Sequence, residues 1–393
     1  MRSIEEFSYI YGAARTPVGK FRGAFSSLPA PELAACAIRE ALKRSQVPLE
    51  RVDEVIMGYV LSAGIGQAPA RQAAIKSGLP FRVGATTINK VCGSGLKAVM
   101  LADDAIRLKN SRFVVAGGME NMSLAPFFLP ALRAGYKLGN RKLVDSLVYD
   151  GLTDSFDHCH MGEIAEKLAG TDEKYNRDAQ DRFALESYRR ARNAQDECHF
   201  SDEIVAVPVL KKGKSLMIDK DEQPHANNLE NFADLPPAFV RPKGSITVGN
   251  ASKLNDGAAA LVLGPADTSL KPLAKVVAQA THAQAPDQFP TAPVKAIELL
   301  LERWHLKQDQ VDLFEINEAF SVAILAVCDQ LGLDLEKVNV NGGAVALGHP
   351  IGASGARILV TLLYALQRRK MKRGIAAICL GGGESVALGI EMI

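Results

Sequence analysis

The sequence contains no long apolar run, no surplus of charge of one sign and no closely spaced pair of cysteines. A membrane-spanning helix needs about 18 or more consecutive apolar residues, and no stretch approaches that length, so no membrane contact is expected. The formal net charge is only +2, which gives no reason to expect a nucleic acid or an anionic membrane as a partner. The first residues, MRSIEEFSYIYGAARTP, lack the apolar core of a signal peptide.

Cysteine is scarce, and its six copies are scattered along 393 residues without any CxxC pair. Such spacing in a chain of this size is typical of reduced thiols rather than of a disulfide framework, which predicts a reducing compartment, the cytoplasm by default. The stretch DHCH at 157–160 offers an alternative role for a cysteine, as part of a zinc site. Its two histidines flank a cysteine and cannot easily converge on one ion, and no second ligand cluster has a suitable spacing. No metal site is therefore predicted.

Short apolar, β-branched runs alternate with longer segments of helical periodicity, which is typical of an α/β protein. Hydrophobic residues make up 47% of the chain and charged residues 23%, as in ordinary globular proteins, and the length predicts two or three domains. The apolar runs include VDEVIMGYV at 52–60, RFVVAGGME at 112–120 and IAAICLGGGES at 375–385.

The two ends of the chain resemble each other. VDEVI is similar to VDLFEI, GSGLKAV to ASGARIL, and AGGMENMS to LGGGESVA, in the same order and at a nearly constant offset. Three such pairs predict two similar α/β halves, residues 1–121 and 272–393. The segment between them differs in composition, because it has many charged residues in a helical pattern and a lysine-rich stretch. Long insertions of this kind often carry binding loops.

Cys92 lies in NKVCGSGLKAV, between a β-branched run and an apolar-periodic segment. A strand-to-helix turn at this point would place the thiol at a helix N-terminus, where free N–H groups and the helix dipole lower a thiol pKa. The pattern is degenerate, however. A small buried thiol with a packing role explains the same residues equally well.

Three further segments carry polar side chains next to predicted strands or helices. His349 lies in a glycine-rich turn before a helix, in the repeat partner of the Cys92 segment, where it could act as a base toward a thiol. Cys379 precedes three glycines whose N–H groups could bind an oxyanion. Asn317 follows the strand FEI and is suited to holding a water or polarising a carbonyl. Together these residues suggest covalent acyl chemistry with an additional acid or base.

These segments resemble the thiolases. The matching pieces, in the order of the family, are RTPVGKFRGAF, GQAPARQAA, NKVCGSGLKAV, GGMENMS, HMGEIAE, GNASKLNDGAAA, NEAF, GHPIGASGAR and CLGGGES. The resemblance implies the duplicated thiolase fold, two βαβαβαββ halves in a five-layered αβαβα arrangement. The expected boundaries are 1–121 plus 250–271 for the first half, 122–249 for an inserted loop domain that binds coenzyme A and mediates oligomerisation, and 272–393 for the second half.

The resemblance also implies the role of each catalytic residue. Cys92 is expected to accept the acyl group as a thioester, His349 to activate it, and Cys379 to exchange a proton with the methyl carbon of acetyl-CoA. Asn317 is expected to hold a water that joins His349 in one oxyanion hole. The N–H groups of Cys92 and Gly381 are expected to form a second one.

The implied substrates are acetyl-CoA, acetoacetyl-CoA and coenzyme A, with no separate cofactor. Five residues are expected along the coenzyme A channel: Leu152, His160, Met161, Val248 and Ser252. The family's assemblies imply a homotetramer or homodimer, with the tetramer loop falling at MSLAPFFLPALRAG, residues 122–135.

Some positions depart from the commonest family pattern. Glu163 follows HMG, His225 stands near a position often occupied by an arginine, and Val248 replaces an alanine before GNAS. The stretch DQFPTAPVKAI is closer to the FPxAP form of some mitochondrial-type members. These differences bear on acyl-chain specificity and coenzyme A contacts rather than on the chemistry.

The leading expectation is a reversible condensation of two acetyl-CoA molecules. A degradative 3-oxoacyl-CoA thiolase of β-oxidation is the close alternative. A non-catalytic acyl-CoA or lipid carrier on the same fold, and a decarboxylating condensing enzyme, are less compatible with two cysteines, a histidine and an asparagine.

Overall fold

The computed structural model describes residues 6–211, 213–226 and 229–393. One mixed sheet of ten strands runs through it in the order β12-β13-β14-β11-β1-β10-β5-β3-β4, with the short β2 paired to β10. The first half of the chain provides β1 (Ser8–Arg15), β2 (Gly19–Lys20), β3 (Val52–Gly58), β4 (Gly84–Ile88), β5 (Phe113–Asn121) and β10 (Asn255–Gly264). The second half provides β11 (Ala274–Ala283), β12 (Leu313–Ile316), β13 (Arg373–Leu380) and β14 (Glu384–Met392).

The two parts of this sheet repeat one topology. In the first, β4, β3 and β5 are parallel, and β10 and β1 follow antiparallel. In the second, β12 and β13 are parallel, and β14 and β11 follow antiparallel. A single bridge from Val338 to Phe314 stands where β4 stands in the first half. The parts are joined where Ser8–Ile10 pairs with 274–276. The duplication predicted from the sequence is therefore present.

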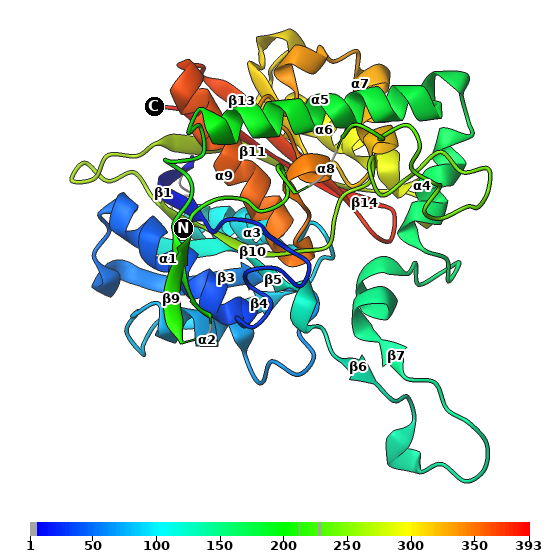
Figure 1. Ribbon diagram of the computed structural model, residues 1–393. Helices are drawn as coiled ribbons and strands as arrows, with labels where there is room; N and C mark the ends of the chain where they lie inside the picture. The colour runs from blue at the N-terminus through cyan, green and yellow to red at the C-terminus, as the bar shows by residue number, and fades with distance from the viewer. Residues whose placement is uncertain (1–5, 212, 227–228) are drawn as a thin grey trace.

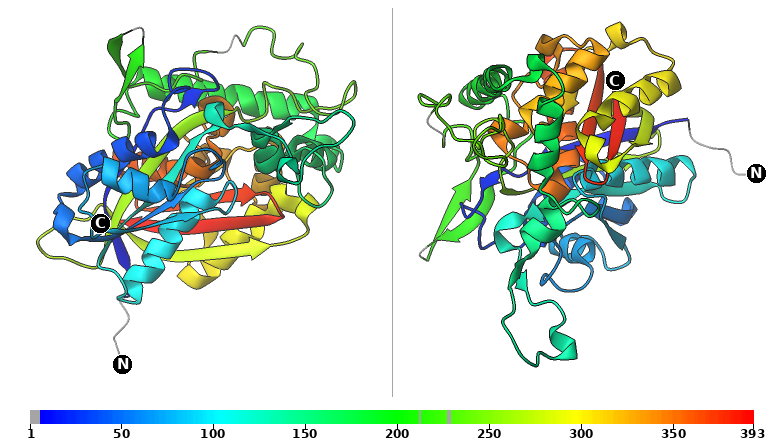
Figure 2. Two further views of the ribbon diagram at one scale, coloured as in Figure 1. Left: turned by 90° about the horizontal axis from the view of Figure 1, so that it is seen from below. Right: turned by 90° about the vertical axis from the view of Figure 1, so that its right-hand side faces the viewer.

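Helices fill both faces of the sheet. The first half carries α1 (Ala30–Ser45), α2 (Pro69–Lys76) and α3 (Ser94–Arg107); the second carries α6 (Ala292–Trp304), α7 (Ser321–Leu331), α8 (Ala344–Leu347) and α9 (Ile351–Arg369). α1 and α2 pack on the outer face of the first part, and α6 and α7 on that of the second. α3 and α9 lie between the two parts (Figures 1 and 2). This is the expected five-layered αβαβα arrangement.

The two central helices approach each other very closely. A Cβ on Gly95 of α3 would lie 2.7 Å from the backbone nitrogen of Ala356, and one on Gly355 of α9 would lie 2.5 Å from that of Leu96. Only glycine permits such contact between helix backbones. Because both contacts fall in the first turns, the beginnings of α3 and α9 are held side by side.

The segment between the halves contributes smaller elements. They are β6 (Phe127–Phe128), β7 (Val144–Asp145), a π-helix (Leu147–Leu152), α4 (Met161–Ala169), α5 (Arg177–Asp196), β8 (Val207–Lys211) and β9 (Lys214–Ile218). The β6–β7 hairpin extends away from the body, and α5 crosses over the second half (Figure 1). Within the described ranges, no helix is both long and apolar enough to span a bilayer.

Candidate active site

Cys92 lies in a tight turn between β4 and α3. Val91, immediately before it, has a φ of 46°, an unusual conformation for a β-branched residue that stores backbone strain. The hydroxyl of Ser94 holds the turn: it accepts the N–H of Lys90 at 2.8 Å and donates to the carbonyl of Val91 at 2.6 Å. The turn therefore fixes Cys92 at the start of α3, as the sequence predicted.

The surroundings of Cys92 shift its pKa in a direction opposite to the one predicted. Burial raises the pKa of this thiol to about 12, although the N–H groups of Gly381 and of Cys92 itself face the sulfur and lower it. The prediction of a lowered pKa is wrong because the desolvation of a thiolate outweighs the helix N-terminus and its N–H groups. The resting group is a neutral thiol.

His349 is held in one orientation next to the start of α9. Its backbone N–H donates to Asn255 Oδ1 at 3.0 Å and to the carbonyl of Lys253 at 3.2 Å. Its Nδ1 lies 2.5 Å from the hydroxyl of Ser354, and that hydroxyl donates to the carbonyl of Pro350 at 2.8 Å. Because the only hydroxyl proton is committed to Pro350, we assign the ring proton to Nδ1, which leaves the lone pair of Nε2 free.

The imidazole of His349 is neutral. The side chain is 7% exposed, and burial, together with the positive charge of Arg357, lowers its pKa to about 3. A neutral ring with a free Nε2 is the form that a general base requires.

Cys379 and Gly381 follow one another at the end of β13. Cys379 is 2% exposed, and burial and the nearby Cys92 both raise its pKa. A Cβ on Gly381 would lie 3.5 Å from Val91 and 3.7 Å from Met161, so the turn after β13 lies against the Cys92 turn. The two cysteines, predicted as partners from opposite halves, are thus brought together.

Asn317 follows β12, and its backbone and side-chain amides differ in their hydrogen bonding. Its backbone N–H donates to the carbonyl of Ala377 at 3.0 Å, which fixes it beside the strand that carries Cys379. The side chain is 1% exposed, and neither its oxygen nor its nitrogen has a hydrogen-bond partner within the described ranges. A buried amide without partners is costly, which is explained if it binds a water or a substrate group.

The residues predicted to line the coenzyme A channel lie further out. Leu152 packs on the same apolar cluster as Cys92, and Met161 on the one that contains Cys379. The N–H of Ser252 donates to the carbonyl of Ala319, two residues after Asn317, at 3.0 Å. These side chains are partly exposed, so they lie between solvent and the buried catalytic group.

The structure explains one of the departures from the family pattern, Glu163. His160 caps α4: its Nδ1 accepts the N–H of Gly162 at 3.0 Å, and Glu163 accepts the N–H of His160 at 3.3 Å. Glu163 thus closes a capping box, and the Nε2 of His160 carries the proton. His225 is exposed and lies 3.1 Å from Asp196. Val248 is 59% exposed, and no contact recorded for it explains the exchange.

Sequence reasoning missed Glu120, whose side chain holds the start of α9 next to the site. The carboxylate of Glu120 accepts the N–H of Gly352 at 2.9 Å, at the start of α9, and those of Val60 and Leu61 at 3.2 Å each. Burial raises the pKa of Glu120 to about 8. The only sequence signal for such a role was the position of Glu120 at the end of a strand, in the motif GGMENMS.

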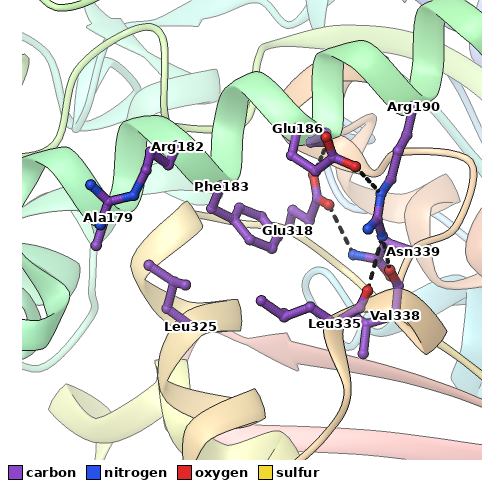
Figure 3. A pocket seen from close by; sticks show the side chains of 11 residues that line it. Ala179, Arg182, Phe183, Glu186, Arg190, Glu318, Leu325, Leu335, Val338 and Asn339 are labelled. Carbon is purple, nitrogen blue, oxygen red and sulfur yellow. Dashed lines mark hydrogen bonds and ion pairs between the residues drawn. The ribbon is translucent and has the colours of Figure 1, made fainter.

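A cavity of about 250 Å³ lies between α5, α7 and the segment after α7 (Figure 3). Apolar side chains of Phe183, Leu325 and Leu335 line it together with Glu318, but none of the predicted catalytic residues does. It is therefore separate from the candidate active site, although its lining residue Glu318 is the neighbour of Asn317.

Two domains of one family match the chain in sequence: "Thiolase, N-terminal domain" over residues 8–267 and "Thiolase, C-terminal domain" over residues 270–392. An acetyl-CoA acetyltransferase from Pseudomonas aeruginosa is 50% identical over 387 residues, which covers 96% of this chain and 98% of the relative. An acetyl-CoA acetyltransferase from Cupriavidus necator is 50% identical over 388 residues, covering 97% and 98%.

Solved structures match equally well. The acetyl-CoA acetyltransferase of Bacillus anthracis superimposes with a TM-score of 0.96 at 41% identity, covering 100% of both chains. A thiolase from Ascaris suum in complex with coenzyme A superimposes with a TM-score of 0.93 at 44% identity, covering 98% of this chain and 100% of the other.

Proposed function

The chain belongs to the thiolase family, and we propose that it works as an acetyl-CoA C-acetyltransferase through the residues described above. The reaction joins two molecules of acetyl-CoA into acetoacetyl-CoA and coenzyme A, and it is reversible. The single observation that carries the proposal is that the Cys379–Gly381 turn lies against the Cys92 turn at the start of α3, while the neutral His349 stands just before α9, whose beginning is packed on that of α3.

In the first step, the sulfur of Cys92 attacks the carbonyl carbon of acetyl-CoA while Nε2 of His349 takes the thiol proton. The bond from that carbon to the sulfur of coenzyme A then breaks, and the departing thiolate receives the proton. The N–H groups of Cys92 and Gly381 already face the Cys92 sulfur. They are therefore suited to binding the oxygen of the acyl group as it gains negative charge.

In the second step, Nε2 of the neutral His349 takes the thiol proton of Cys379, and the Cys379 thiolate removes a methyl proton from a second acetyl-CoA. The protonated Nε2 of His349 and a water held by Asn317 donate hydrogen bonds to the enolate oxygen. The enolate carbon attacks the acyl group on Cys92, and the new carbon–carbon bond forms as the Cys92 sulfur leaves and takes the proton back from His349. Because Cys92 helps to raise the pKa of Cys379, acylation of Cys92 removes one obstacle to ionising the second cysteine.

The channel and the insertion are proposed to hold the rest of coenzyme A. Leu152, His160, Met161, Ser252 and Val248 line the path of the pantetheine, and residues 122–249 hold the nucleotide end. The gradient of exposure from Val248 to the buried Asn317 supports this direction of entry.

We further propose a homotetramer or homodimer in the cytoplasm. The hairpin around β6 and β7 exposes apolar side chains that a second copy could cover: Leu124, Phe127, Leu129, Leu132, Leu138 and Leu143. All six cysteines are free thiols, which supports a reducing compartment. Light scattering on the purified protein, with Phe127→Ser and Leu138→Ser combined, tests the assembly.

The experiment that tests the activity is a thiolysis profile. Purified protein is given coenzyme A with acetoacetyl-CoA or with a longer 3-oxoacyl-CoA, and loss of each substrate is followed. A preference for acetoacetyl-CoA is expected. A strong preference for the longer substrate would favour a degradative 3-oxoacyl-CoA thiolase, and no turnover of either would overturn the enzyme assignment.

A further inference from the structure

Lys253 follows Ser252 in GNASKLNDG, and neither step above uses its side chain. Its Nζ donates to three backbone carbonyls, at 2.6 Å to Ala251, 3.3 Å to Val345 and 3.4 Å to Gly249. An ammonium group has three donors and no acceptor, so three carbonyls match the charged form. A neutral amine would direct its lone pair at one of these oxygens.

Lys253 is half-buried, and the acidic group that acts on its ammonium is Glu318. Burial lowers the pKa of Lys253 to about 7 and raises the pKa of Glu318, while the charge of Glu318 acts on Lys253 in the opposite direction and favours the charged lysine. The ring of Tyr188 also faces the ammonium, with its centroid 5.6 Å from Nζ. A buried cation persists only where such partners compensate for the lost water.

The backbone of Val345 lies between Lys253 and Glu318. Its N–H donates to Oε2 of Glu318 at 3.0 Å, and its carbonyl accepts from Lys253. Val345 belongs to α8, the short helix that leads into the turn of His349. Lys253 contacts this segment a second time, because its own carbonyl accepts the N–H of His349 at 3.2 Å.

Glu318 connects Val345 to the segment that carries Asn317. It directly follows Asn317, and its second oxygen accepts from Asn339 at 2.9 Å, as Figure 3 shows beside the cavity. Ser187 of α5 donates to Oε2 at 2.8 Å. The carboxylate therefore cannot turn away from Val345 without losing several hydrogen bonds.

We propose that Lys253 is a positioning residue, a tethered internal cation that clamps Val345 against Glu318 and so sets His349 relative to Asn317 and Ser252. The clamp joins the segments 249–253, 317–318 and 344–349, although none of its charged atoms contacts a reacting atom. This inference rests on the proposed roles of His349 and Asn317.

The first test replaces the charge and keeps the length of the side chain, with Lys253→Met. A misplacement of a catalytic group by about 1 Å can cost about a hundredfold in rate. We expect kcat to fall by about that factor while KM changes a few-fold. Lys275→Met is the matched control, because Lys275 is also partly buried and ion-paired, at 3.4 Å from Glu391, away from the site. A kcat for Lys253→Met within twofold of the unmodified enzyme would overturn the proposal.

The second test restores the cation from solution. Lys253→Ala removes the atoms of a propylammonium ion, so n-propylammonium chloride should raise the kcat of this variant at least tenfold. Tetramethylammonium chloride has no N–H donor and should recover none. Restored thermal stability without restored kcat would show a merely structural lysine and overturn the proposal. So would a folded, inactive variant that propylammonium leaves unchanged, or a failure of both variants to fold.

The unmodified enzyme, assayed in parallel, separates this inference from the proposed function. If that enzyme does not turn over acetoacetyl-CoA, the function assignment fails. If it does and the Lys253 variants behave like Lys275→Met, only the clamp fails.

Discussion

The Nδ1 of His349 lies 2.5 Å from the hydroxyl of Ser354, whose proton is donated to the carbonyl of Pro350. These two hydrogen bonds give the histidine one tautomer through a hydroxyl group. Ser354 is the repeat counterpart of Ser94, which holds the Cys92 turn in the first half through its own hydroxyl. The same serine of each half therefore organises a different member of the catalytic pair.

Replacing this hydroxyl should remove the tautomer preference. In Ser354→Ala, we expect kcat to fall by about a hundredfold, the range that a positioned general base contributes. Ser321→Ala is the matched control, because its buried hydroxyl has no partner in the described part of the chain, and its kcat should stay within about twofold. Equal losses in both variants would show that the relay does not govern the base.

The two cysteines should fail at different steps. Cys92→Ala should form no acetyl-enzyme, because the attacking sulfur is missing. Cys379→Ala should still be acetylated by acetyl-CoA but should lose condensation, because no base remains for the methyl proton. Intact-protein mass spectrometry and an acetoacetyl-CoA assay distinguish the two steps. Condensation retained by Cys379→Ala would exclude the role given to Cys379.

Asn317 should matter for rate and little for stability. Its buried amide has no partner within the described ranges, so Asn317→Ala should leave the thermal midpoint unchanged or raised. Its kcat should fall on the order of a hundredfold through the loss of one oxyanion-hole group. Rates and thermal melts of the purified variant test both effects.

Asn339→Ala provides a control for the loss of stability. Asn339 bonds the N–H and the carbonyl of Ile316 at 2.8 Å each and also donates to Glu318. Its loss should lower the free energy of unfolding by about 1–3 kcal/mol. If Asn317→Ala were destabilised as much as Asn339→Ala, the amide would be structural rather than catalytic.

The sequence revealed those parts of the site that are local. Cys92, His349, Cys379 and Asn317 each stand at a strand end or a helix start, and the internal repeat paired their segments before any contact was known. The duplicated fold was predictable for the same reason. The bounds of the inserted segment, by contrast, remain predictions.

The groups that tune the site could not be read from the sequence, because their roles depend on segments far apart in the chain. Glu120 acts on α9, and Lys253 acts on α8, through hydrogen bonds that no local pattern encodes. The pKa of Cys92 depends on how much protein covers the sulfur. A helix N-terminus alone predicts the wrong direction, because it ignores that burial.

The pH dependence of alkylation tests this direction. Burial raises the pKa of Cys92 to about 12 and lowers that of His349 to about 3, so between these values the resting pair is a neutral thiol and a neutral imidazole. Only the thiolate reacts with iodoacetamide, and below its pKa the thiolate fraction rises about tenfold per pH unit. The alkylation rate of Cys92 in the free enzyme should therefore climb without a plateau from pH 6 to about pH 10. Cys379→Ala should be used for the measurement, so that Cys92 is the one thiol of the cysteine pair left to react, with the double variant Cys92→Ala/Cys379→Ala as the background. A plateau at or below about pH 8 would instead indicate a preformed thiolate–imidazolium pair, and the first step would then begin with a charged nucleophile.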